Sequence, residues 1–311
     1  MGDCLLLTSP VRALKEEFPE FRISVVVEER FADCFAGNPD FDEIIAARGK
    51  SRTAARLFMR YFDAIINLHG GPTSLFYTFL PLGTRIGAEH YQGARLYNGR
   101  FPPPEPHLHT VESTMTVFRW MGLSSADAPP LQFARHTKAA ERFEKMFKGQ
   151  PYAVIHPASI MTTKRWPADR FATFAHWLTG EGLTVVLTAG PGEEPIVGEV
   201  AQRHPDTVML LALTIPELAE LIRGARLYVG NDSGPMHLAT AVGTPTLAVW
   251  GSSDSRRWHP WGVEYRVVQN PFECNPCPGY RCLVADSPLC IESVTVEQVQ
   301  AAAKQLLSVQ R

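Results

Sequence analysis

The sequence predicts an α/β protein built from two doubly wound domains in tandem. Short apolar segments rich in β-branched residues alternate with helical patterns along the chain, as in parallel sheets covered by helices. The 311 residues exceed one ordinary core and suit two domains of about 150 residues each. A second regular α/β pattern starts at Gln150 and Pro151. We therefore expect domains at 1–149 and 150–311.

The first half alternates helices and strands. Val11, Leu14 and Phe18 recur at helical spacing and predict a helix over 10–18. Further helices are expected at 53–61, 109–121 and 137–147. Apolar or β-branched runs predict strands at 22–28, 43–46, 64–68 and 85–87, and 101–106 is a Pro-rich loop.

The second half is more regular. Strands are expected at 152–156, 184–188, 208–211, 226–229 and 246–250, and helices at 167–178, 194–203, 216–223, 235–242 and 297–307. Two such domains place the carboxyl ends of two sheets opposite each other across a cleft, and open α/β sheets bind ligands at those ends. This layout suits an enzyme that joins two substrates.

Composition excludes several classes of protein. The net charge of −2 argues against a nucleic-acid binder. No run of 18 or more apolar residues is present, and Met1 leads into Gly2 without the pattern of a signal peptide. We expect a cytoplasmic protein with peripheral membrane contact at most.

A candidate phosphate site lies within 227–251. An apolar strand runs into GNDSG at 230–234, and Pro235 follows in the first turn of a helix. Free N–H groups at the positive end of a helix dipole bind anions, and His237 in the first turn can donate to a phosphate oxygen. A strand, glycine and helix in succession are equally typical of a turn without a ligand, so this feature alone leaves both interpretations open.

Five motifs together resemble those of the bacterial lipopolysaccharide heptosyltransferases, glycosyltransferase family 9. They are GDCLLLTSP at 2–10 with RALK at 12–15, NP at 38–39 with DEII at 42–45, KRWP at 164–167 with RF at 170–171, GPGE at 190–193, and DSGPMHLATAVGTP at 232–245. The resemblance implies a GT-B fold of two Rossmann-like domains. It implies inverting, metal-independent transfer from ADP-heptose to the lipopolysaccharide inner core, with no cofactor.

The resemblance also implies roles for the donor-side residues. Asp3 matches the general base and is expected in a loop facing the cleft. The alternative, that Asp3 caps a helix starting near Pro10, is disfavoured because Asp3 lies too far upstream. Lys164 matches the residue that contacts the donor diphosphate. Glu193 matches the carboxylate that binds the ribose hydroxyls, and the neighbouring Glu194 is the alternative if the match is displaced by one position. The turn that binds the diphosphate and sugar comprises Asp232, Ser233, Gly234 and His237.

Three residues of the first domain are weaker candidates for acceptor binding. Arg12 and Lys15 lie one helical turn apart and can meet phosphates or carboxylates, although a solvated helix face is the commoner explanation. His69 follows a strand beside two glycines and is equally compatible with a structural role.

Four cysteines are clustered near the end of the chain. Cys274, Cys277, Cys282 and Cys290 have a spacing that permits a tetrahedral zinc site, and a structural cluster or a labile disulfide is equally open. We expect no catalytic role for them.

The sequence departs from the family pattern at its beginning. Family members have an apolar strand before the GD motif, whereas here only Met1 precedes Gly2. A first strand is central in a doubly wound sheet, and each buried group left unpaired costs about 1–3 kcal/mol. We therefore expect a misplaced start or truncated copy with a less stable first domain. Equal stability of the chain with and without the upstream codons would contradict this.

Two other functions remain compatible with the sequence. A sugar-nucleotide epimerase can share the two-domain architecture but needs neither the GD motif nor an acceptor groove. A non-catalytic nucleotide-sugar binding protein is the third interpretation. The acceptor sugar, the linkage, the addition step and the oligomeric state do not follow from the sequence.

Overall fold

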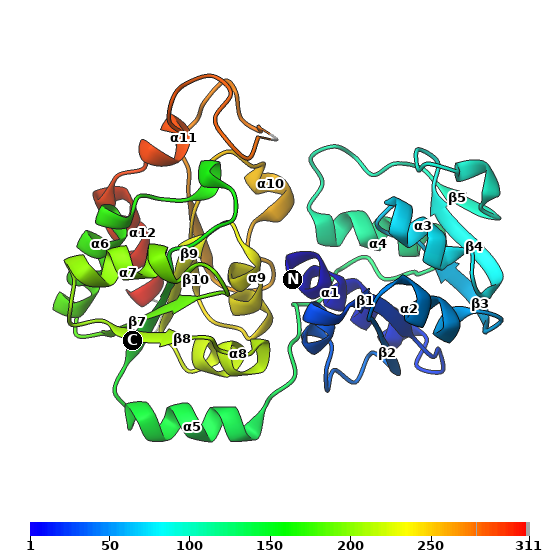
Figure 1. Cartoon of the computed structure of the whole chain (residues 1–311), viewed down its shortest axis with the longest axis horizontal. Helices are drawn as coiled ribbons and strands as arrows, with labels where there is room; N and C mark the ends of the chain where they lie inside the picture. Colours follow the sequence, from blue (N-terminus) through cyan, green and yellow to red (C-terminus); the bar gives the residue numbers. More distant parts are fainter. Residues whose placement is uncertain (278, 309–311) are drawn as a thin grey trace. The chain divides into compact units, whose positions relative to one another are not determined.

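The computed structural model describes residues 1–277 and 279–308 (Figure 1). It divides into two compact units: the N-terminal unit, Leu7–Pro129, and the C-terminal unit, Met1–Leu6 with Pro130–Arg311. The sequence places the boundary at 149/150, but the structure places it at 129/130. The reason is that residues 130–149 bond to the C-terminal unit: Phe133 N donates to Ala241 O (3.1 Å) and His136 N to Glu220 Oε1 (2.9 Å).

The C-terminal unit is built on one six-stranded parallel sheet. The strand order is β11-β10-β9-β6-β7-β8. The bounds are β6 Tyr152–His156, β7 Thr184–Ala189, β8 Val208–Leu211, β9 Leu227–Asn231, β10 Thr246–Val249 and β11 Tyr265–Val268. The first five confirm the predicted strands. β11 was not predicted because a charged residue interrupts this short, half-buried edge strand.

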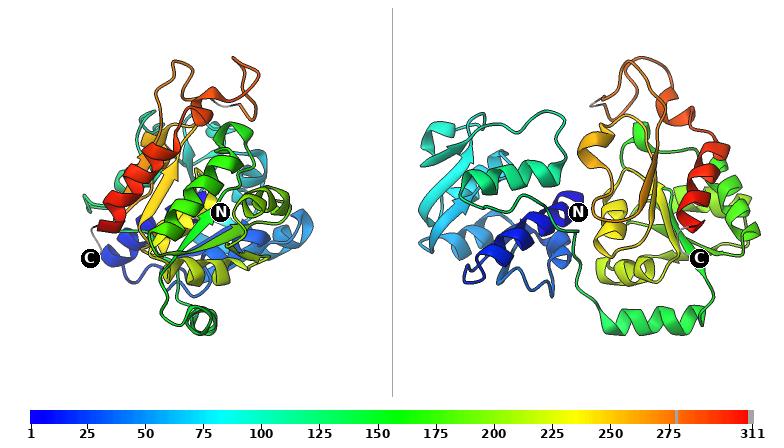
Figure 2. Two further views of the ribbon diagram at one scale, coloured as in Figure 1. Left: turned by 90° about the vertical axis from the view of Figure 1, so that its left-hand side faces the viewer. Right: turned by 180° about the vertical axis from the view of Figure 1, so that it is seen from behind.

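Helices cover both faces of this sheet (Figures 1 and 2). One face carries α6 (Ala168–Gly180), α7 (Glu194–Arg203) and α12 (Val296–Ser308). The other face carries α8 (Ile215–Arg223) and α9 (Gly234–Ala241), and α5 (Thr137–Phe147) packs on α8. The first face buries Phe171, Val197 and Val299 in one core with the sheet. The short helices are α10 (Ser255–Trp258) and α11 (Leu289–Glu292). Burial of the apolar helix stripes stabilises this layered arrangement.

The N-terminal unit contains two parallel sheets instead of one doubly wound sheet. β1 (Ser24–Glu28) pairs with β2 (Glu43–Ala47), and β3 (Tyr61–Ile66), β4 (Leu82–Ala88) and β5 (Gly99–Phe101) form the second sheet. Its remaining elements are α2 (Lys50–Leu57), α3 (Pro72–Thr78), α4 (Thr110–Trp120) and the 3₁₀ helices Glu29–Cys34 and Ala94–Leu96.

The chain begins with a helix, so the loop expected around Asp3 is wrong. α1 spans Gly2–Glu17 and contains Pro10. Leu5, Leu6 and Val11 are buried along it, so apolar burial outweighs the missing N–H of the proline. Among the described residues, no helix has the length and apolar character needed to cross a membrane.

The boundary between α2 and β3 lies earlier than predicted. α2 ends at Leu57, and Met59 adopts φ 62°, which breaks the helix before the predicted 61. Leu82 N donates to Arg60 O (2.7 Å), and Tyr61 then pairs with Leu82. Backbone pairing with β4 therefore starts the strand at Tyr61, and the expected strand at 64–68 is shifted.

Candidate functional site

Lys164 and Asp232 meet at the carboxyl edge of the six-stranded sheet. Lys164 ends the 3₁₀ helix Thr162–Lys164, and Asp232 directly follows β9. Lys164 Nζ lies 2.6 Å from Asp232 Oδ2, which also accepts a hydrogen bond from Ser253 Oγ at 2.5 Å. The side chains are only 19% and 6% exposed, so little water screens this ion pair. The sequence did not single out Ser253, which lies in the loop after β10.

Asn231 fixes the KRWP segment against the GNDSG turn. Its side chain is fully buried; Oδ1 accepts from Trp166 N (3.0 Å) and Nδ2 donates to Pro157 O (2.8 Å). The Trp166 indole N–H in turn donates to Val294 O at 2.9 Å. A buried amide with both ends bonded holds two loops in one register. The position of Lys164 is thus set by a residue of β9.

The predicted anion site lies at the start of α9 (Gly234–Ala241). Ser233 is the N-cap but makes no side-chain capping bond, and Pro235 stands in the first turn. His237 is buried, and its Nδ1 has no hydrogen-bond partner among the described residues. Burial lowers the pKa of His237 to about 4, an effect opposed by nearby Asp232 and Asp3. The imidazole is therefore neutral near pH 7 and offers one donor and one acceptor.

The first residues of the chain lie against α9. A Cβ added at Gly2 would lie 2.8 Å from His237 Cδ2, and one at Gly234 would lie 2.6 Å from Met1 Cε. Asp3 is exposed in the first turn of α1 and acts electrostatically on His237. The C-terminal unit therefore brings Asp3 to the predicted donor turn.

Glu193 is held at the end of β7. Its Oε2 accepts from Gly190 N (2.7 Å) and lies 3.2 Å from His156 Nε2. The hydrogen bond with His156 lowers the pKa of Glu193, and burial opposes this effect. The buried His156 also bonds through Nδ1 to Thr188 Oγ1 at 3.1 Å. Glu194 is exposed at the start of α7.

His156 was not predicted from the sequence. It ends the buried strand β6, and in the sheet it pairs with Gly230 of β9. A histidine that closes an otherwise apolar strand was the signal available. The partner, Glu193, could not be foreseen because it comes from a different strand-to-helix turn.

The three acceptor candidates belong to the N-terminal unit. Arg12 Nε pairs with Glu16 Oε1 (3.0 Å), and Lys15 Nζ bonds to Asp42 Oδ2 (3.1 Å) and to Phe21 O. His69 is exposed. These partners show how the helix face is held; the acceptor roles stay predictions.

The four clustered cysteines are free thiols. Cys274 is exposed, Cys290 is buried, and Cys277 and Cys282 are intermediate. Among residues 1–277 and 279–308, no group of three or more His, Cys, Asp or Glu side chains could hold a metal ion. The structure therefore gives no support to the zinc interpretation of this cluster.

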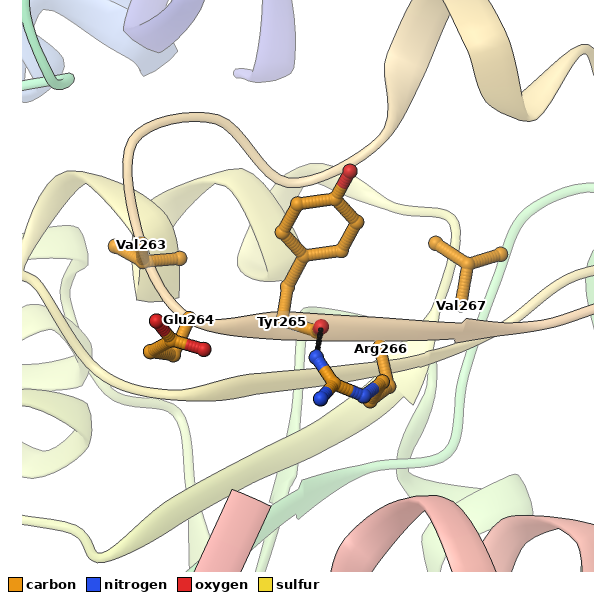
Figure 3. A pocket seen from close by; sticks show the side chains of 5 residues that line it. All are labelled: Val263, Glu264, Tyr265, Arg266 and Val267. Atoms are coloured by element: carbon orange, nitrogen blue, oxygen red, sulfur yellow. Dashed lines mark hydrogen bonds between the residues drawn. The ribbon is translucent and has the colours of Figure 1, made fainter. Parts of the chain in front are cut away.

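Two hollows lie on the C-terminal unit. The larger, about 560 Å³, is lined by residues 263–267 on the edge strand β11, where Tyr265 and Val267 point to the opposite side from Arg266 (Figure 3). The second, about 290 Å³, is lined in part by Thr162, Arg165 and Trp166, next to Lys164. None of the predicted donor residues lines either of these two hollows.

Comparison with known proteins identifies relatives along most of the chain. Residues 51–286 match the family described as glycosyltransferase family 9 (heptosyltransferase). The lipopolysaccharide heptosyltransferase 3 of Escherichia coli is 28% identical over 84% of this chain and 83% of that protein.

Solved structures share the fold. A glycosyl transferase family 9 from Veillonella parvula DSM 2008 superimposes with a TM-score of 0.84 at 20% identity, over 99% of this chain and 94% of that one. The E. coli heptosyltransferase WaaC with ADP-2-deoxy-2-fluoro heptose gives 0.75 at 21% identity, over 100% and 96%. The GT-B fold class is thereby confirmed.

Proposed function

Because the chain belongs to glycosyltransferase family 9, we propose that it transfers a heptose from ADP-heptose to the inner core of lipopolysaccharide. The family is one of heptosyltransferases, and the E. coli relative is a lipopolysaccharide heptosyltransferase. A donor analogue with an ADP group is bound in the similar WaaC structure. The observation that carries the proposal is the Lys164–Asp232 pair beside the start of α9.

The donor is bound by groups of the C-terminal unit. Lys164 and the N-terminus of α9 meet the diphosphate, because a cation and the positive end of a helix dipole both favour anions. His237 donates to a phosphate oxygen through its unpaired ring nitrogen. Asp232 accepts hydrogen bonds from sugar hydroxyls, and Glu193 accepts those of the ribose. Ser233 contributes its hydroxyl, and Gly234 completes the turn.

The transfer is a single displacement that inverts the anomeric centre. The Asp3 carboxylate takes the proton of the acceptor hydroxyl while its oxygen forms a bond to the anomeric carbon. The bond from this carbon to the diphosphate oxygen breaks, and ADP leaves with the electron pair. Lys164 and the α9 N–H groups stabilise the charge that develops on ADP, so no metal ion is required. Turnover in excess EDTA should equal turnover without it.

The acceptor is bound by the N-terminal unit. Arg12, Lys15 and His69 are the proposed contacts to its anionic groups. To use Lys15, the acceptor must compete with Asp42 for the ammonium group. We place the reaction in the cytoplasm, at the inner face of the membrane that carries the acceptor lipid.

Turnover of ADP-heptose with an inner-core lipid acceptor tests the proposal. Asp3→Asn should lower kcat by about 100-fold to 10,000-fold, the usual range for loss of a general base, with ADP binding retained. The matched control is Asp206→Asn, which changes an exposed carboxylate on the loop between α7 and β8. Equal kcat in Asp3→Asn and the native chain would remove the base assignment.

The same assay separates the other two functions. A binding protein would bind ADP-heptose without turnover in any variant. An epimerase would convert the donor into its epimer without an acceptor. Family membership favours the transferase over the epimerase.

A further inference from the structure

One end of the N-terminal unit exposes apolar side chains that would ordinarily be buried. Phe58 is 64% exposed, Met59 61%, Tyr61 70% and Leu82 44%. Single exposed apolar residues are common, but four within one turn and one strand pair form a patch. We call these residues, together with Arg48, Lys50, Arg52 and Arg56, the α2 tip.

The backbone directs the apolar side chains of the α2 tip outward. α2 buries Thr53 and Leu57, so its inward face is already filled. The positive φ of Met59 turns the chain directly after the helix. Tyr61 and Leu82 are register partners at the amino ends of β3 and β4, and their side chains are therefore neighbours. The patch follows from local geometry and is not a frayed terminus.

The surrounding charge is basic. Residues 48–60 contain five cations, of which three are in the outward part of α2, and no Asp or Glu. The acids of neighbouring elements are Glu29, which pairs with Arg48 (2.7 Å), Glu43, which pairs with Arg60 (2.7 Å) and Arg56 (3.5 Å), and the exposed Asp63 on β3. Lys50 and Arg52 are exposed and have no ion-pair partner among the described residues.

We propose that the α2 tip docks on an anionic lipid bilayer. Apolar side chains beside exposed cations suit the membrane interface. There the apolar side chains enter the headgroup region, and the cations contact the lipid phosphates. A second copy of this chain would bring the same cations together and be repelled. Nucleic acid offers no apolar phase for Phe58 and Met59. Charge complementarity therefore selects an anionic membrane surface.

This docking surface goes beyond the proposed transfer reaction and does not depend on it. Vesicle binding requires neither ADP-heptose nor acceptor. ADP binding in the absence of vesicles tests the donor site separately. Failure of one proposal is thus distinguishable from failure of the other.

Co-sedimentation with vesicles tests the proposal. The full chain should pellet with vesicles of phosphatidylethanolamine and phosphatidylglycerol, remain in the supernatant with phosphatidylcholine, and be released by salt. Phe58→Ser with Met59→Asn should weaken binding about 10-fold or more, because apolar insertion is lost. Asparagine tolerates the left-handed backbone at 59. Lys50→Glu with Arg52→Glu should weaken vesicle binding by a similar factor, since each cation near an anionic surface raises the binding affinity about fivefold.

The controls make comparable apolar and charge changes in the C-terminal unit. Met146→Ser with Met209→Ser removes two exposed apolar side chains, and Lys138→Glu with Lys145→Glu reverses two charges on α5. Both controls should bind like the native chain, and circular dichroism should show that all variants are folded. Absence of native binding to anionic vesicles would overturn the proposal, as would equal binding by the α2-tip variants. Self-association lost in Phe58→Ser with Met59→Asn, without vesicle binding, would identify a second copy as the occupant and also overturn it.

Discussion

The ammonium group of Lys164 and the carboxylate of Asp232 lie 2.6 Å apart, although 67 residues separate them in the chain. Lys164 belongs to the segment after β6 and Asp232 to the turn after β9, two strands that are neighbours in the sheet. Asp232 stands two residues before Gly234, the first residue of α9. A bound diphosphate would find a cation that is already positioned.

Removal of the Lys164 charge tests this pair. Lys164→Met should lower kcat/KM for ADP-heptose by about 100-fold or more, since a placed charge stabilises the leaving diphosphate. Steady-state kinetics with a fixed acceptor concentration measures the effect. Lys138→Met on the exposed surface of α5 is the control and should leave kcat/KM unchanged. Native kinetics in Lys164→Met would show that the ammonium group does not contact the donor.

His156 should act on donor binding through Glu193. His156→Phe removes the hydrogen bond that holds the pKa of Glu193 low, while the ring still fills the space. Because the pKa of Glu193 is lower in the folded than in the unfolded chain, the charged carboxylate stabilises the folded protein at pH values above the ordinary pKa of 4.5. This stabilisation is lost as the pH falls through the pKa of the folded state. His156→Phe should therefore move the acidic loss of ADP affinity to higher pH and raise the KM for ADP-heptose with little change in kcat.

Calorimetric titration of ADP over a series of pH values measures this displacement. His176→Phe, at an exposed position of α6, is the control. A merely structural role of His156 predicts lower thermal stability but the same acidic limb as the native chain. That result would contradict the positioning role.

His237 should make stability depend on pH. The unfolded chain binds a proton at the ordinary histidine pKa of 6.5, whereas the folded chain does so only near 4. The unfolding free energy should thus fall as pH drops from 6.5 to 4, by at most about 3 kcal/mol. Urea unfolding of His237→Gln should show a flatter pH dependence over this range. His176→Gln should keep the native profile, and an equally steep profile in His237→Gln would assign the dependence to other groups.

Gly2 should not tolerate a side chain. The Cβ of Gly2→Ala would lie 2.8 Å from His237 Cδ2, so the first turn of α1 or the imidazole must shift. We expect lower turnover, because Asp3 moves with that turn, and a loss of about 1–3 kcal/mol in unfolding free energy. Gly198→Ala in α7 meets no atom within 4 Å and should stabilise the chain by up to about 1 kcal/mol. Native turnover in Gly2→Ala would show that the contact is not required.

The regular half of the fold could be predicted because its signals are local. β6, β7 and β9 are buried apolar runs, and α8 begins with a capping box at Thr214 and Glu217. The loop expected before Pro10 was wrong because burial of Leu5 and Leu6 overrides the helix-breaking tendency of proline.

By itself the sequence determined the family, the α/β class and the identity of the candidate donor residues, because motif spacing and hydrophobic period are properties of the chain. The tertiary structure alone decided which of these residues meet. His156 reaches Glu193, and Ser253 reaches Asp232, because parallel strands bring their carboxyl ends to one edge of the sheet. The partnership of Gly2 with His237 also depends on packing between distant segments, which no local pattern encodes.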